Sequence, residues 1–384
     1  MNTDLLKSIT SFIRSLYPGM ETVPLHAPVF FGKEKEYLAE CIDTTYVSYV
    51  GSYVNRFEEM ISTYTGAKYA IATVNGTCAL QTALLIAGIK PGDFVITQAL
   101  TFVATANAIH FANATPVFID SDPQDLGMDI SKLEEFLSQE CRMNEDGFCY
   151  HKVTNRRISA CVPVHIFGHP VKIDKVVEIC EKYNITVIED AAESLGSTYK
   201  GKHTGTFGLL GILSFNGNKT VTTGGGGMIL TNDKDLATRA RHITTTAKTI
   251  HPYEFFHDEL GFNYRMTNLN AAIGVAQMEN FDFIIRNKRE TAARYNEFFT
   301  NLGMDFFTEK ENSFSNYWLN VLLMKDRNER NDLLELTNAS GITTRPAWRL
   351  MTDLPMYSGN IHTDLSNAVK LENTIVNLPS SIRK

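Results

Sequence analysis

The strongest constraint on the fold is a regular alternation of short apolar runs and helical segments between residues 69 and 188. The apolar runs are rich in β-branched residues and cover 69–74, 94–97, 115–119, 159–165 and 185–188. The helical segments lie between them and cover 78–88, 101–111, 129–140 and 174–183. Because the apolar runs do not alternate with polar residues, they are typical of strands buried on both faces. The pattern therefore predicts an α/β fold with a mostly parallel central sheet covered by helices.

The pattern changes after the four glycines at 224–227, which lead into the strand-like run MILTN. A helix of small residues, a long charged helix, a strand, a helix and an extended piece are expected at 269–278, 281–302, 316–324, 330–338 and 342–346. The long charged helix is suited to link two lobes, and the chain is long enough for two. We predict a large domain over 24–270 and a smaller C-terminal α/β domain over 271–384. The charged segment 139–157 is expected to be an exposed insertion.

Residues 1–23 are predicted to carry a separate N-terminal amphipathic helix. Apolar residues recur there at helical spacing, namely Leu5, Leu6, Ile9, Phe12, Ile13 and Leu16. Lys7 and Arg14 interrupt them, and no small-residue cleavage site follows, which disfavours a secretory signal. No apolar run reaches the roughly 18 residues of a membrane span. We expect the helix to pack on the body of the protein or on a partner subunit rather than on a membrane.

Charge and cysteine usage exclude several other classes. The formal net charge is −7 and no basic block or stripe appears, so neither nucleic acid nor an acidic membrane surface is expected as a partner. The six cysteines form no CxxC or CxxH pattern. Buried, reduced thiols are therefore expected rather than disulfides or metal ligands, which predicts a cytoplasmic protein without a metal site.

Two groups that pyridoxal phosphate requires from a protein occur in the central part of the chain. The acidic pair Glu189-Asp190 ends an apolar run, and Lys219 lies between a strand-like run and the glycine tract. A carboxylate can hold a protonated ring nitrogen, and a lysine can form an imine with an aldehyde. Each residue also has an ordinary interpretation, since Asp190 could cap a loop and Lys219 could be a solvated surface lysine.

Three other features could complete such a site. Asn75-Gly76-Thr77 lies between a strand and a helix, where free amides favour a phosphate, although Thr77 could equally be part of an ordinary helix start. Phe102 could stack on a ring or belong to the core. The glycine tract fits neither a P-loop nor a dinucleotide-binding motif, because it leads into a strand. We interpret it as backbone that runs close to the cofactor.

Taken together, these segments resemble the sugar aminotransferases of the DegT/DnrJ/EryC1/StrS family. The resemblance begins at Pro24, and its most specific segments are NGTCAL, TFVATANAI, VHIFGHP, IEDAAESLGS, GTFGLLGILSFNGNKTVTTGGGGMILTND and GFNYRMTNLNAAIG. It implies the aspartate-aminotransferase-like fold (fold type I of pyridoxal-phosphate enzymes) and a homodimer with shared active sites. SFNGNK and ITQALTFVATANAI resemble the branch that acts in legionaminic acid and bacillosamine synthesis.

The resemblance also implies roles for individual residues. Lys219 would bond the cofactor, Asp190 would pair with its ring nitrogen, and Phe102 would stack on the ring. Further members of the implied cofactor site are Gly76, Thr77 and Ser214 at the phosphate, Asn263 reaching across the dimer, and Glu193. Glu193 departs from the glutamine of many relatives, and a carboxylate donates a hydrogen bond only when protonated. His165 is expected to be structural, and Lys248, Tyr317, Arg345 and Trp348 are candidates for substrate contacts.

The predicted reaction is transfer of an amino group from glutamate, through pyridoxamine phosphate, to C4 of a nucleotide-linked 4-keto-6-deoxy-N-acetylhexosamine in bacterial surface-sugar synthesis. A UDP-linked sugar is favoured over a GDP-linked one. Two alternatives stay open. A dehydratase of the same fold would carry histidine in place of the lysine, and a non-catalytic regulator would be expected to lose Asp190 or Lys219. Both residues are present.

Overall fold

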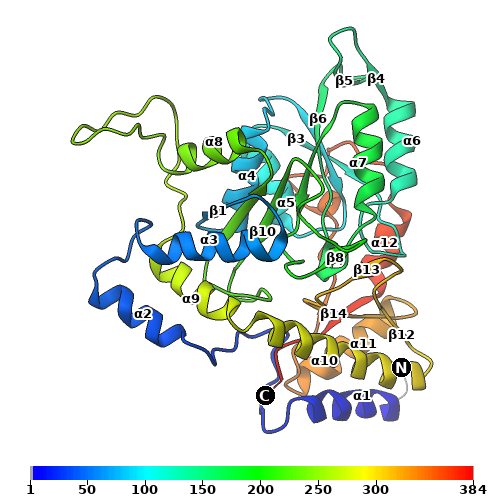
Figure 1. Cartoon of the computed structure of the whole chain (residues 1–384). Coiled ribbons are helices and arrows are strands. Elements are labelled where there is room, and N and C mark those ends of the chain that lie inside the picture. The colour runs from blue at the N-terminus through cyan, green and yellow to red at the C-terminus, as the bar shows by residue number, and fades with distance from the viewer. Residues whose placement is uncertain (1–2, 384) are drawn as a thin grey trace.

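A mixed sheet lies at the centre of the protein, as the computed structural model shows for the described residues 3–383 (Figure 1). Along its main path the strand order is β1-β11-β10-β7-β6-β2-β3. The bounds are β1 Tyr69–Thr73, β2 Phe94–Gln98, β3 Thr115–Ile119, β6 Arg157–Val162, β7 Thr186–Asp190, β10 Leu210–Ser214 and β11 Gly227–Thr231. The strands from β10 to β3 run parallel, whereas β11 is antiparallel to both β10 and β1. The prediction of a mostly parallel sheet is confirmed.

Helices cover both faces of this sheet, as the uninterrupted apolar strands require. One face packs against α4 (Gly76–Ile86), α5 (Val103–Phe111) and α8 (Lys234–Thr244). The other face packs against α6 (Ile130–Glu140) and α7 (Ile173–Lys182) at one end. At its other end that face meets α3 (Ser52–Thr65) and α9 (Asn268–Met278), with α2 (Glu34–Asp43) outside them. Successive residues of each strand point to opposite faces of the sheet, so Ile188 of β7 faces α4 while Val187 faces α7.

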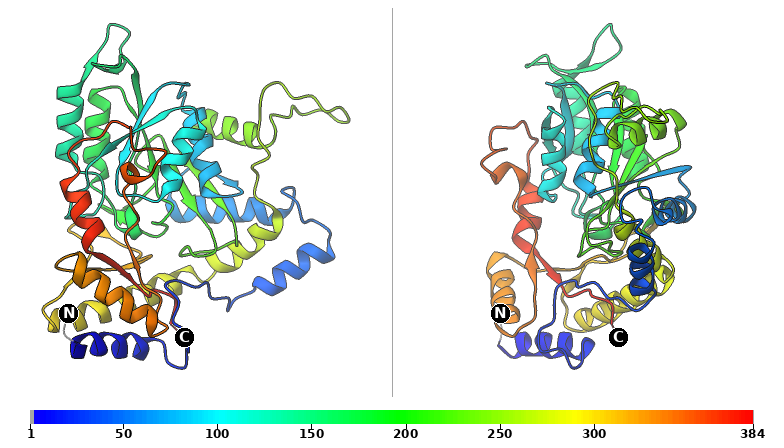
Figure 2. Two further views of the ribbon diagram at one scale, coloured as in Figure 1. Left: turned by 180° about the vertical axis from the view of Figure 1, so that it is seen from behind. Right: turned by 90° about the vertical axis from the view of Figure 1, so that its left-hand side faces the viewer.

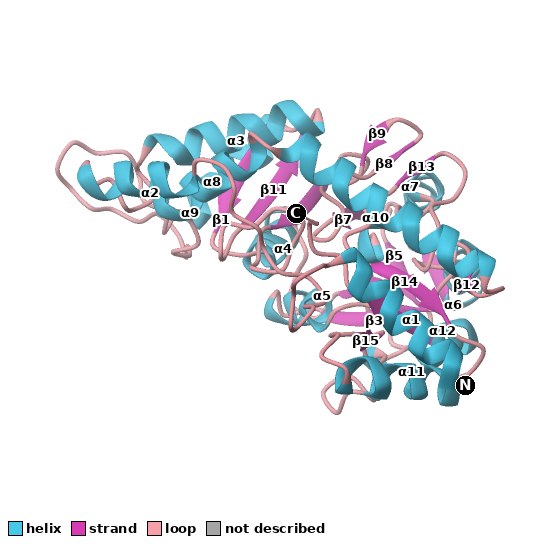
Figure 3. Cartoon of the chain, turned by 90° about the horizontal axis from the view of Figure 1, so that it is seen from below, coloured by secondary structure: helices cyan, strands magenta, loops and turns pink. Residues whose placement is uncertain are grey.

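The C-terminal part builds a second, smaller sheet of order β12-β14-β16-β15. Its strands are β12 Asp305–Phe306, β14 Asn320–Leu323, β15 Arg345–Pro346 and β16 Ile375–Leu378. It is joined to the central part through α10 (Phe281–Asn301) and carries α11 (Arg327–Ala339) and α12 (Ser366–Thr374), as seen from below in Figure 3. The predicted boundary at 270 falls inside α9, whose contacts with α2 and α3 keep it with the central sheet.

The N-terminal helix α1 (Thr3–Leu16) packs on the smaller sheet. Ile9 and Ile13 are fully buried there, in one cluster with Tyr295 of α10 and Leu333 of α11. Both chain ends lie at this end of the molecule (Figure 2). The amphipathic pattern of α1 is therefore explained by its packing against the rest of the chain. Within residues 3–383, no helix combines the length and apolar character needed to cross a membrane.

Three local differences from the expected elements have physical reasons. The predicted insertion 139–157 is a protruding hairpin of β4 (Cys141–Met143) and β5 (Cys149–His151), visible at the top of Figure 1. The run expected as a strand over 159–165 ends at Val162, because the chain then turns into the short helix η1 (Ile166–Gly168). β14 is shorter than the apolar run 316–324, because Asn316 is occupied with loop hydrogen bonds.

Among the elements that were not predicted from the sequence, the following are very short. β8 (Thr198–Tyr199), β9 (Lys202–His203) and β13 (Ser313–Phe314) form a small third sheet, which pairs a loop of the central part with the C-terminal part. η2 (Met351–Asp353) follows Trp348. These pieces are only two or three residues long, so they leave no periodic pattern in the sequence.

Candidate active site

A cavity of about 320 Å³ opens beyond the carboxyl ends of β7 and β10, where parallel α/β sheets generally bind their ligands. The first turns of α4 and α5 form one side of it, and Trp318 and Trp348 of the C-terminal part close the other. The cavity wall includes eight of the residues proposed from the sequence, namely Gly76, Thr77, Phe102, Asp190, Glu193, Ser214, Lys219 and Trp348. Residues that are up to 272 positions apart in sequence thus meet at one site.

Asp190 is the last residue of β7, and its carboxylate is held by two donors. The Thr105 hydroxyl donates to Oδ2 at 2.8 Å, and the Ala192 amide donates to Oδ1 at 3.1 Å. The side chain is 7% exposed, and within residues 3–383 it has no ion-pair partner. A buried carboxylate without a cation is suited to stabilise a positive charge on a ligand that enters the cavity. Thr105 was missed by sequence reasoning, because a threonine in the apolar helix pattern of α5 gives no separate signal.

Lys219 reaches the same cavity from the loop after β10. Its Nζ lies 3.3 Å from Oε1 of Glu193 and 3.9 Å from the ring centroid of Trp318. Oε2 of Glu193 accepts a hydrogen bond from the Phe167 amide at 2.7 Å. Burial raises the pKa of Glu193, while Lys219 and the Phe167 amide oppose that increase. Lys219 is therefore an amine that lies between a carboxylate and an aromatic face, inside a largely enclosed site.

The start of α4 supplies the anion-binding corner. Asn75 is the N-cap, and its side chain accepts a hydrogen bond from the Cys78 amide at 2.8 Å. The first amides of a helix have no partners within it, and its N-terminus carries positive partial charge. A Cβ on Gly76 would lie 3.0 Å from Cβ of Ser214, so glycine lets this helix start directly beside the end of β10. The arrangement can hold a phosphate.

The glycine tract has a different position from the one predicted. Among the described residues, none of the four glycines 224–227 lines the cavity. A Cβ on Gly227 would lie 2.4 Å from the carbonyl of Asn75, and one on Gly226 would lie 2.3 Å from the Thr223 hydroxyl. The close approach that requires glycine is thus to the chain itself, to the Asn75 backbone at Gly227 and to the Thr223 side chain at Gly226. Gly227 thereby lets β11 pass directly beside the start of α4.

Aromatic side chains form much of the remaining wall. Phe102, at the N-cap of α5, lines the cavity and is 48% exposed, so part of its ring is accessible to a ligand. Its ring centroid lies 5.8 Å from that of Trp348, which in turn lies 4.9 Å from Phe167. Trp318 donates its ring N–H to the carbonyl of Asn218 at 2.7 Å. Trp318 lies within the apolar run NYWLN and was interpreted only as part of a strand.

Four predicted residues do not line this cavity in the described chain. Arg345 lines an adjoining cavity of about 310 Å³, which shares Asn218, Trp318 and Trp348 with the first. Tyr317 is buried, and its hydroxyl accepts the Glu309 amide at 3.2 Å.

Lys248 and Asn263 belong to the long loop between α8 and α9, which extends away from the body in Figure 1. Nζ of Lys248 lies 4.0 Å from the ring centroid of Phe255 in that loop, and Asn263 pairs with Thr245 as an isolated bridge. Neither residue reaches the cavity of its own chain.

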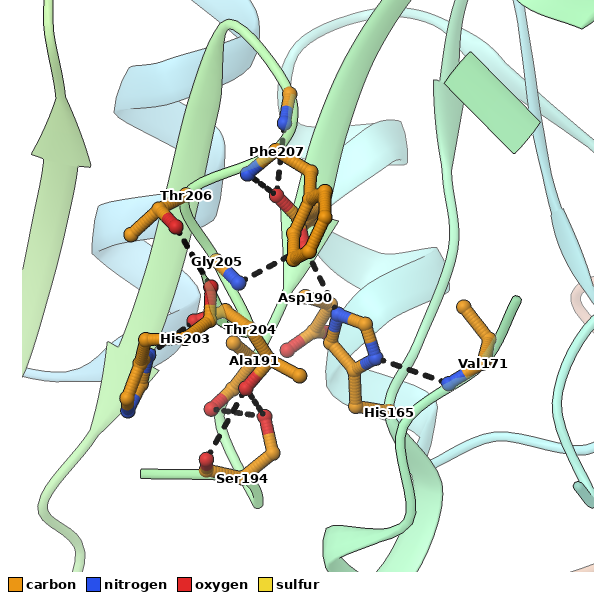
Figure 4. A network of polar contacts seen from close by, with 12 residues as sticks. His165, Val171, Asp190, Ala191, Ser194, His203, Thr204, Gly205, Thr206 and Phe207 are labelled. Carbon is orange, nitrogen blue, oxygen red and sulfur yellow. Dashed lines mark hydrogen bonds and ion pairs between the residues drawn. The ribbon is translucent and has the colours of Figure 1, made fainter. Parts of the chain in front are cut away.

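The other half of the acidic pair has a structural position. Because side chains alternate along β7, Glu189 points to the opposite face from Asp190. There it accepts the amides of Gly205, Phe207 and Gly208 at 2.8, 2.6 and 2.8 Å, in the network of Figure 4. Burial alone would raise the pKa of Glu189, but hydrogen bonds from His165 and these amides hold it below its usual range.

His165 completes that network. Its Nε2 lies 3.0 Å from Glu189, and its Nδ1 accepts the Val171 amide at 3.3 Å (Figure 4). Since an amide can only donate, the ring proton is on Nε2 and is donated to Glu189. Both ring nitrogens are thus engaged within the protein. His165 is structural in this arrangement, as the sequence analysis expected.

A sequence model of the DegT/DnrJ/EryC1/StrS aminotransferase family matches residues 31–383. The chain belongs to this family. The GDP-perosamine synthases of Escherichia coli O157:H7 and Caulobacter vibrioides are 41% identical over 339 residues (88% of each chain) and 36% identical over 363 residues (93% of each chain). The UDP-2-acetamido-2-deoxy-3-oxo-D-glucuronate aminotransferase of Pseudomonas aeruginosa is 33% identical over 279 residues, 72% of each chain.

Solved structures agree with the fold. A DegT DnrJ EryC1 StrS aminotransferase from Brucella abortus superposes with a TM-score of 0.83 at 26% identity, over 91% of this chain and 90% of that one. DesI, crystallised in the presence of its TDP-sugar product, has a TM-score of 0.82 at 26% identity, over 97% and 91% of the two chains. The aspartate-aminotransferase-like fold predicted from the sequence is confirmed, and this chain is a sugar aminotransferase that uses pyridoxal phosphate.

The cavity fits that cofactor on its own chemistry. It offers one amine at Lys219, one carboxylate without a cation at Asp190, an exposed aromatic face at Phe102 and a helix N-terminus at Gly76. These are the groups needed for an imine, a ring nitrogen, a flat ring and a phosphate. The presence of Lys219 also disfavours the dehydratase alternative, which would require histidine at this position.

Proposed function

We propose that this aminotransferase transfers an amino group from glutamate to the C4 ketone of a nucleotide-linked 4-keto-6-deoxyhexose. The observation that carries the proposal is the single cavity in which Lys219 and Asp190 meet beside the start of α4. The similarity to two GDP-perosamine synthases over at least 88% of this chain supports a sugar-nucleotide acceptor. Surface-polysaccharide synthesis is the setting in which such amino sugars are used.

For the nucleotide, we infer a GDP-linked sugar in place of the UDP-linked N-acetylhexosamine favoured by the sequence motifs. The relatives at 41% and 36% identity have names that state GDP, whereas the relative whose name states UDP is 33% identical over a smaller part of the chain. Specificity for the nucleotide is set by contacts away from the reacting atoms. The assay therefore has to compare GDP-linked with UDP-linked acceptors.

When bound, pyridoxal phosphate supplies an aldehyde that bonds amines and a ring that accepts electrons. We assign Gly76, Thr77 and Ser214 to its phosphate and Phe102 to its ring face. Asp190 holds a proton on the ring nitrogen, and Thr105 fixes the orientation of that carboxylate. Lys219 takes the proton from Cα of the amino donor and returns it to the cofactor carbon, acting first as base and then as acid.

We further propose that two copies of the chain form a homodimer in which Asn263 of one copy reaches the phosphate corner of the other. The long loop between α8 and α9 carries several exposed apolar side chains, namely Ile250, Tyr253, Phe255, Phe256 and Leu260. A second exposed group covers the end of α2 and the residues after it, namely Ile42, Tyr46, Val47, Tyr49 and Val50. Apolar surface of this extent is typical of a protein–protein interface. A dimer mass by light scattering, lost when Phe255 and Leu260 become serine, would support this assembly.

We also propose that the enzyme works in the cytoplasm. All six cysteines are free thiols, five of them buried. Unpaired thiols are typical of a reducing compartment.

The reaction is tested by incubating the purified enzyme with glutamate and a panel of 4-keto and 3-keto sugars linked to GDP or UDP. We expect release of 2-oxoglutarate with the GDP-linked 4-keto-6-deoxy sugar. Lys219→Ala should abolish the absorbance band of the cofactor bonded to lysine and lower turnover by at least about 10²–10⁴-fold, the usual contribution of a general acid–base. Activity with 3-keto sugars alone would overturn the assignment to C4, and an unchanged spectrum in Lys219→Ala would overturn the role of that lysine.

A further inference from the structure

Two neighbours of Lys219 in the cavity can interact with an ammonium group. Oε1 of Glu193 lies 3.3 Å from Nζ, and the ring of Trp318 lies 3.9 Å from it. A carboxylate stabilises an ammonium group through charge, and an indole face does so through its quadrupole. A neutral lysine, or one bonded to a cofactor carbon, forfeits much of this stabilisation. The two contacts therefore act on the state in which Lys219 is free.

The Glu193 carboxylate is held firmly in place. Its Oε2 accepts the Phe167 amide at 2.7 Å, and the side chain is only 5% exposed. Phe167 has a φ of 56°, a left-handed conformation that costs energy for a residue with a side chain. Trp348 packs on the Phe167 ring, with centroids 4.9 Å apart. Part of the wall is thus shaped to aim one amide at Oε2, which leaves Oε1 directed at Lys219.

We propose that Glu193 holds Lys219 as an ammonium group whenever the lysine is not bonded to the cofactor, and so favours the lysine-free, amine-bearing form of the cofactor. This inference rests on the proposed role of Lys219. Glu193 is a positioning residue in this account, because it acts through Lys219. A glutamine at the same place could still accept the Phe167 amide, but it would offer no charge to the lysine.

Glu193 is expected to act on the step in which the amino donor displaces Lys219 from the cofactor. The nitrogen of the amino donor would take the place of the Lys219 nitrogen on the cofactor carbon. One C=N bond would break and one would form, and the protons that the donor nitrogen loses would pass to Lys219, which would leave as an ammonium group. No oxidant or reductant is needed for this exchange. Glu193 stabilises the product side, since it gains a cation there and would otherwise remain a buried carboxylate without one.

The effect has a defined direction with pH. Lys219 and Asp190 are the charged groups that act on Glu193 within the cavity, and Asp190 opposes ionisation of the second carboxyl. Burial raises the pKa of Glu193 above its ordinary value. As pH falls through that raised pKa, Glu193 takes up a proton and its hold on Lys219 weakens. The advantage of the lysine-free form should therefore shrink at acidic pH in the native protein.

The test uses full-length, cofactor-free protein and two ligands. Pyridoxal phosphate can bond Lys219, whereas 4′-deoxypyridoxine phosphate has no aldehyde and cannot. In Glu193→Gln we expect pyridoxal phosphate to bind about 10-fold or more tightly than in the native protein, as the loss of a hydrogen bond to a charged group implies. Affinity for 4′-deoxypyridoxine phosphate should change by less than about 3-fold, and the difference between the proteins should shrink as pH falls.

A double-mutant cycle separates this account from a simple cofactor contact. In a Lys219→Ala background, Glu193→Gln should no longer alter the affinity for pyridoxal phosphate. Equal weakening of both ligands in Glu193→Gln would overturn the proposal, since it would mean that Glu193 contacts the ring. Weaker binding of pyridoxal phosphate alone would also overturn it, since Glu193 would then stabilise the bonded lysine.

Failure of this inference about Glu193 can be distinguished from failure of the proposed reaction with sugar nucleotides. Capture of pyridoxal phosphate involves no sugar, so an enzyme that fails on every sugar nucleotide can still show the predicted change in Glu193→Gln. Conversely, a native spectrum in Lys219→Ala would remove the role of that lysine and the inference with it. A second readout on loaded enzyme is the equilibrium between glutamate and 2-oxoglutarate, which Glu193→Gln should shift toward the aldehyde form by a similar factor.

Discussion

The two sides of β7 use neighbouring carboxylates in opposite ways. On one side, Glu189 is fully enclosed and is saturated by His165 and three backbone amides. On the other, Asp190 has only two donors within residues 3–383, Thr105 and Ala192, and faces a cavity. A carboxylate whose hydrogen bonds are all supplied by the protein stabilises a loop, whereas one with free capacity can serve a ligand. The difference lies in the partners, since both residues lie in one buried strand.

The largest expected effect that tests this comparison is on the cavity side. Asp190→Asn keeps the size of the side chain but removes its charge, so the ring nitrogen of the cofactor loses the group that keeps it protonated. We expect the rate of the half-reaction with glutamate to fall by about 10²-fold or more, consistent with the 1–3 units by which an opposite charge shifts a pKa. Single-turnover absorbance measurements would show it. A normal rate in this variant would mean that Asp190 has no role at the ring.

The next effect is expected at Glu189, on the enclosed face of β7, and it concerns the stability of the fold. Glu189→Gln removes a buried charge from three amides and from His165, and it turns an NH₂ group toward donors. We expect the free energy of unfolding to fall by about 1–3 kcal/mol, the usual cost of leaving a buried donor without an acceptor. Urea denaturation would measure it, and turnover of the protein that remains folded should stay within about 3-fold of native. A loss of activity without a loss of stability would contradict the assignment of this side as structural.

Asp125 is a third buried carboxylate, and it extends the comparison because one of its two oxygens receives no hydrogen bond from the described residues. Oδ1 of Asp125 accepts the Gly127 amide at 2.9 Å, while Oδ2 has no hydrogen-bond partner in the described chain. Burial, together with nearby Asp122, raises the pKa of Asp125 to about 7. The folded protein therefore favours the protonated form, and its stability should decline as pH rises from about 4 to about 7.

Asp125→Asn should remove this contribution to the pH dependence, which amounts to about 1.4 kcal/mol per pH unit across that window. Thermal denaturation of both proteins at a series of pH values is the measurement. At pH 8 the variant should be the more stable of the two. The same slope in the variant would assign the pH dependence to other groups.

The smallest effect concerns the residue that orients Asp190. Thr105→Val removes the hydroxyl that donates to Oδ2 at 2.8 Å and preserves the shape of the side chain. We expect kcat/KM to fall by about 10-fold, as for one hydrogen bond to a charged group, with little change in stability. Thr101, whose hydroxyl lies 3.1 Å from that of Thr105, provides a matched control. Thr101→Val should have a smaller effect, and an equal effect would assign the function to the threonine pair.

Sequence patterns were a good guide where a residue's role depends on its neighbours in the chain. Asp190, Gly76 and Phe102 lie where predicted strands and helices meet, so the residue pattern could single them out, whereas Ser214 followed from the family resemblance. Thr105 and Trp318 could not be recognised, because each lies in an apolar pattern that also describes a core residue. The glycine tract was recognised as a site of close approach, but what it approaches is set by packing against Asn75.

The sequence by itself determined the α/β alternation, the family and the set of groups that can serve pyridoxal phosphate, because these follow from local periodicity and residue chemistry. Only the tertiary structure decided which donors each carboxylate of the pair Glu189-Asp190 receives and what Glu193 touches. Adjacent residues of a strand point to opposite faces, and whether a face is closed depends on segments far away in the chain. Amides from the loop 205–208 close one face of β7, while the other remains open to the cofactor.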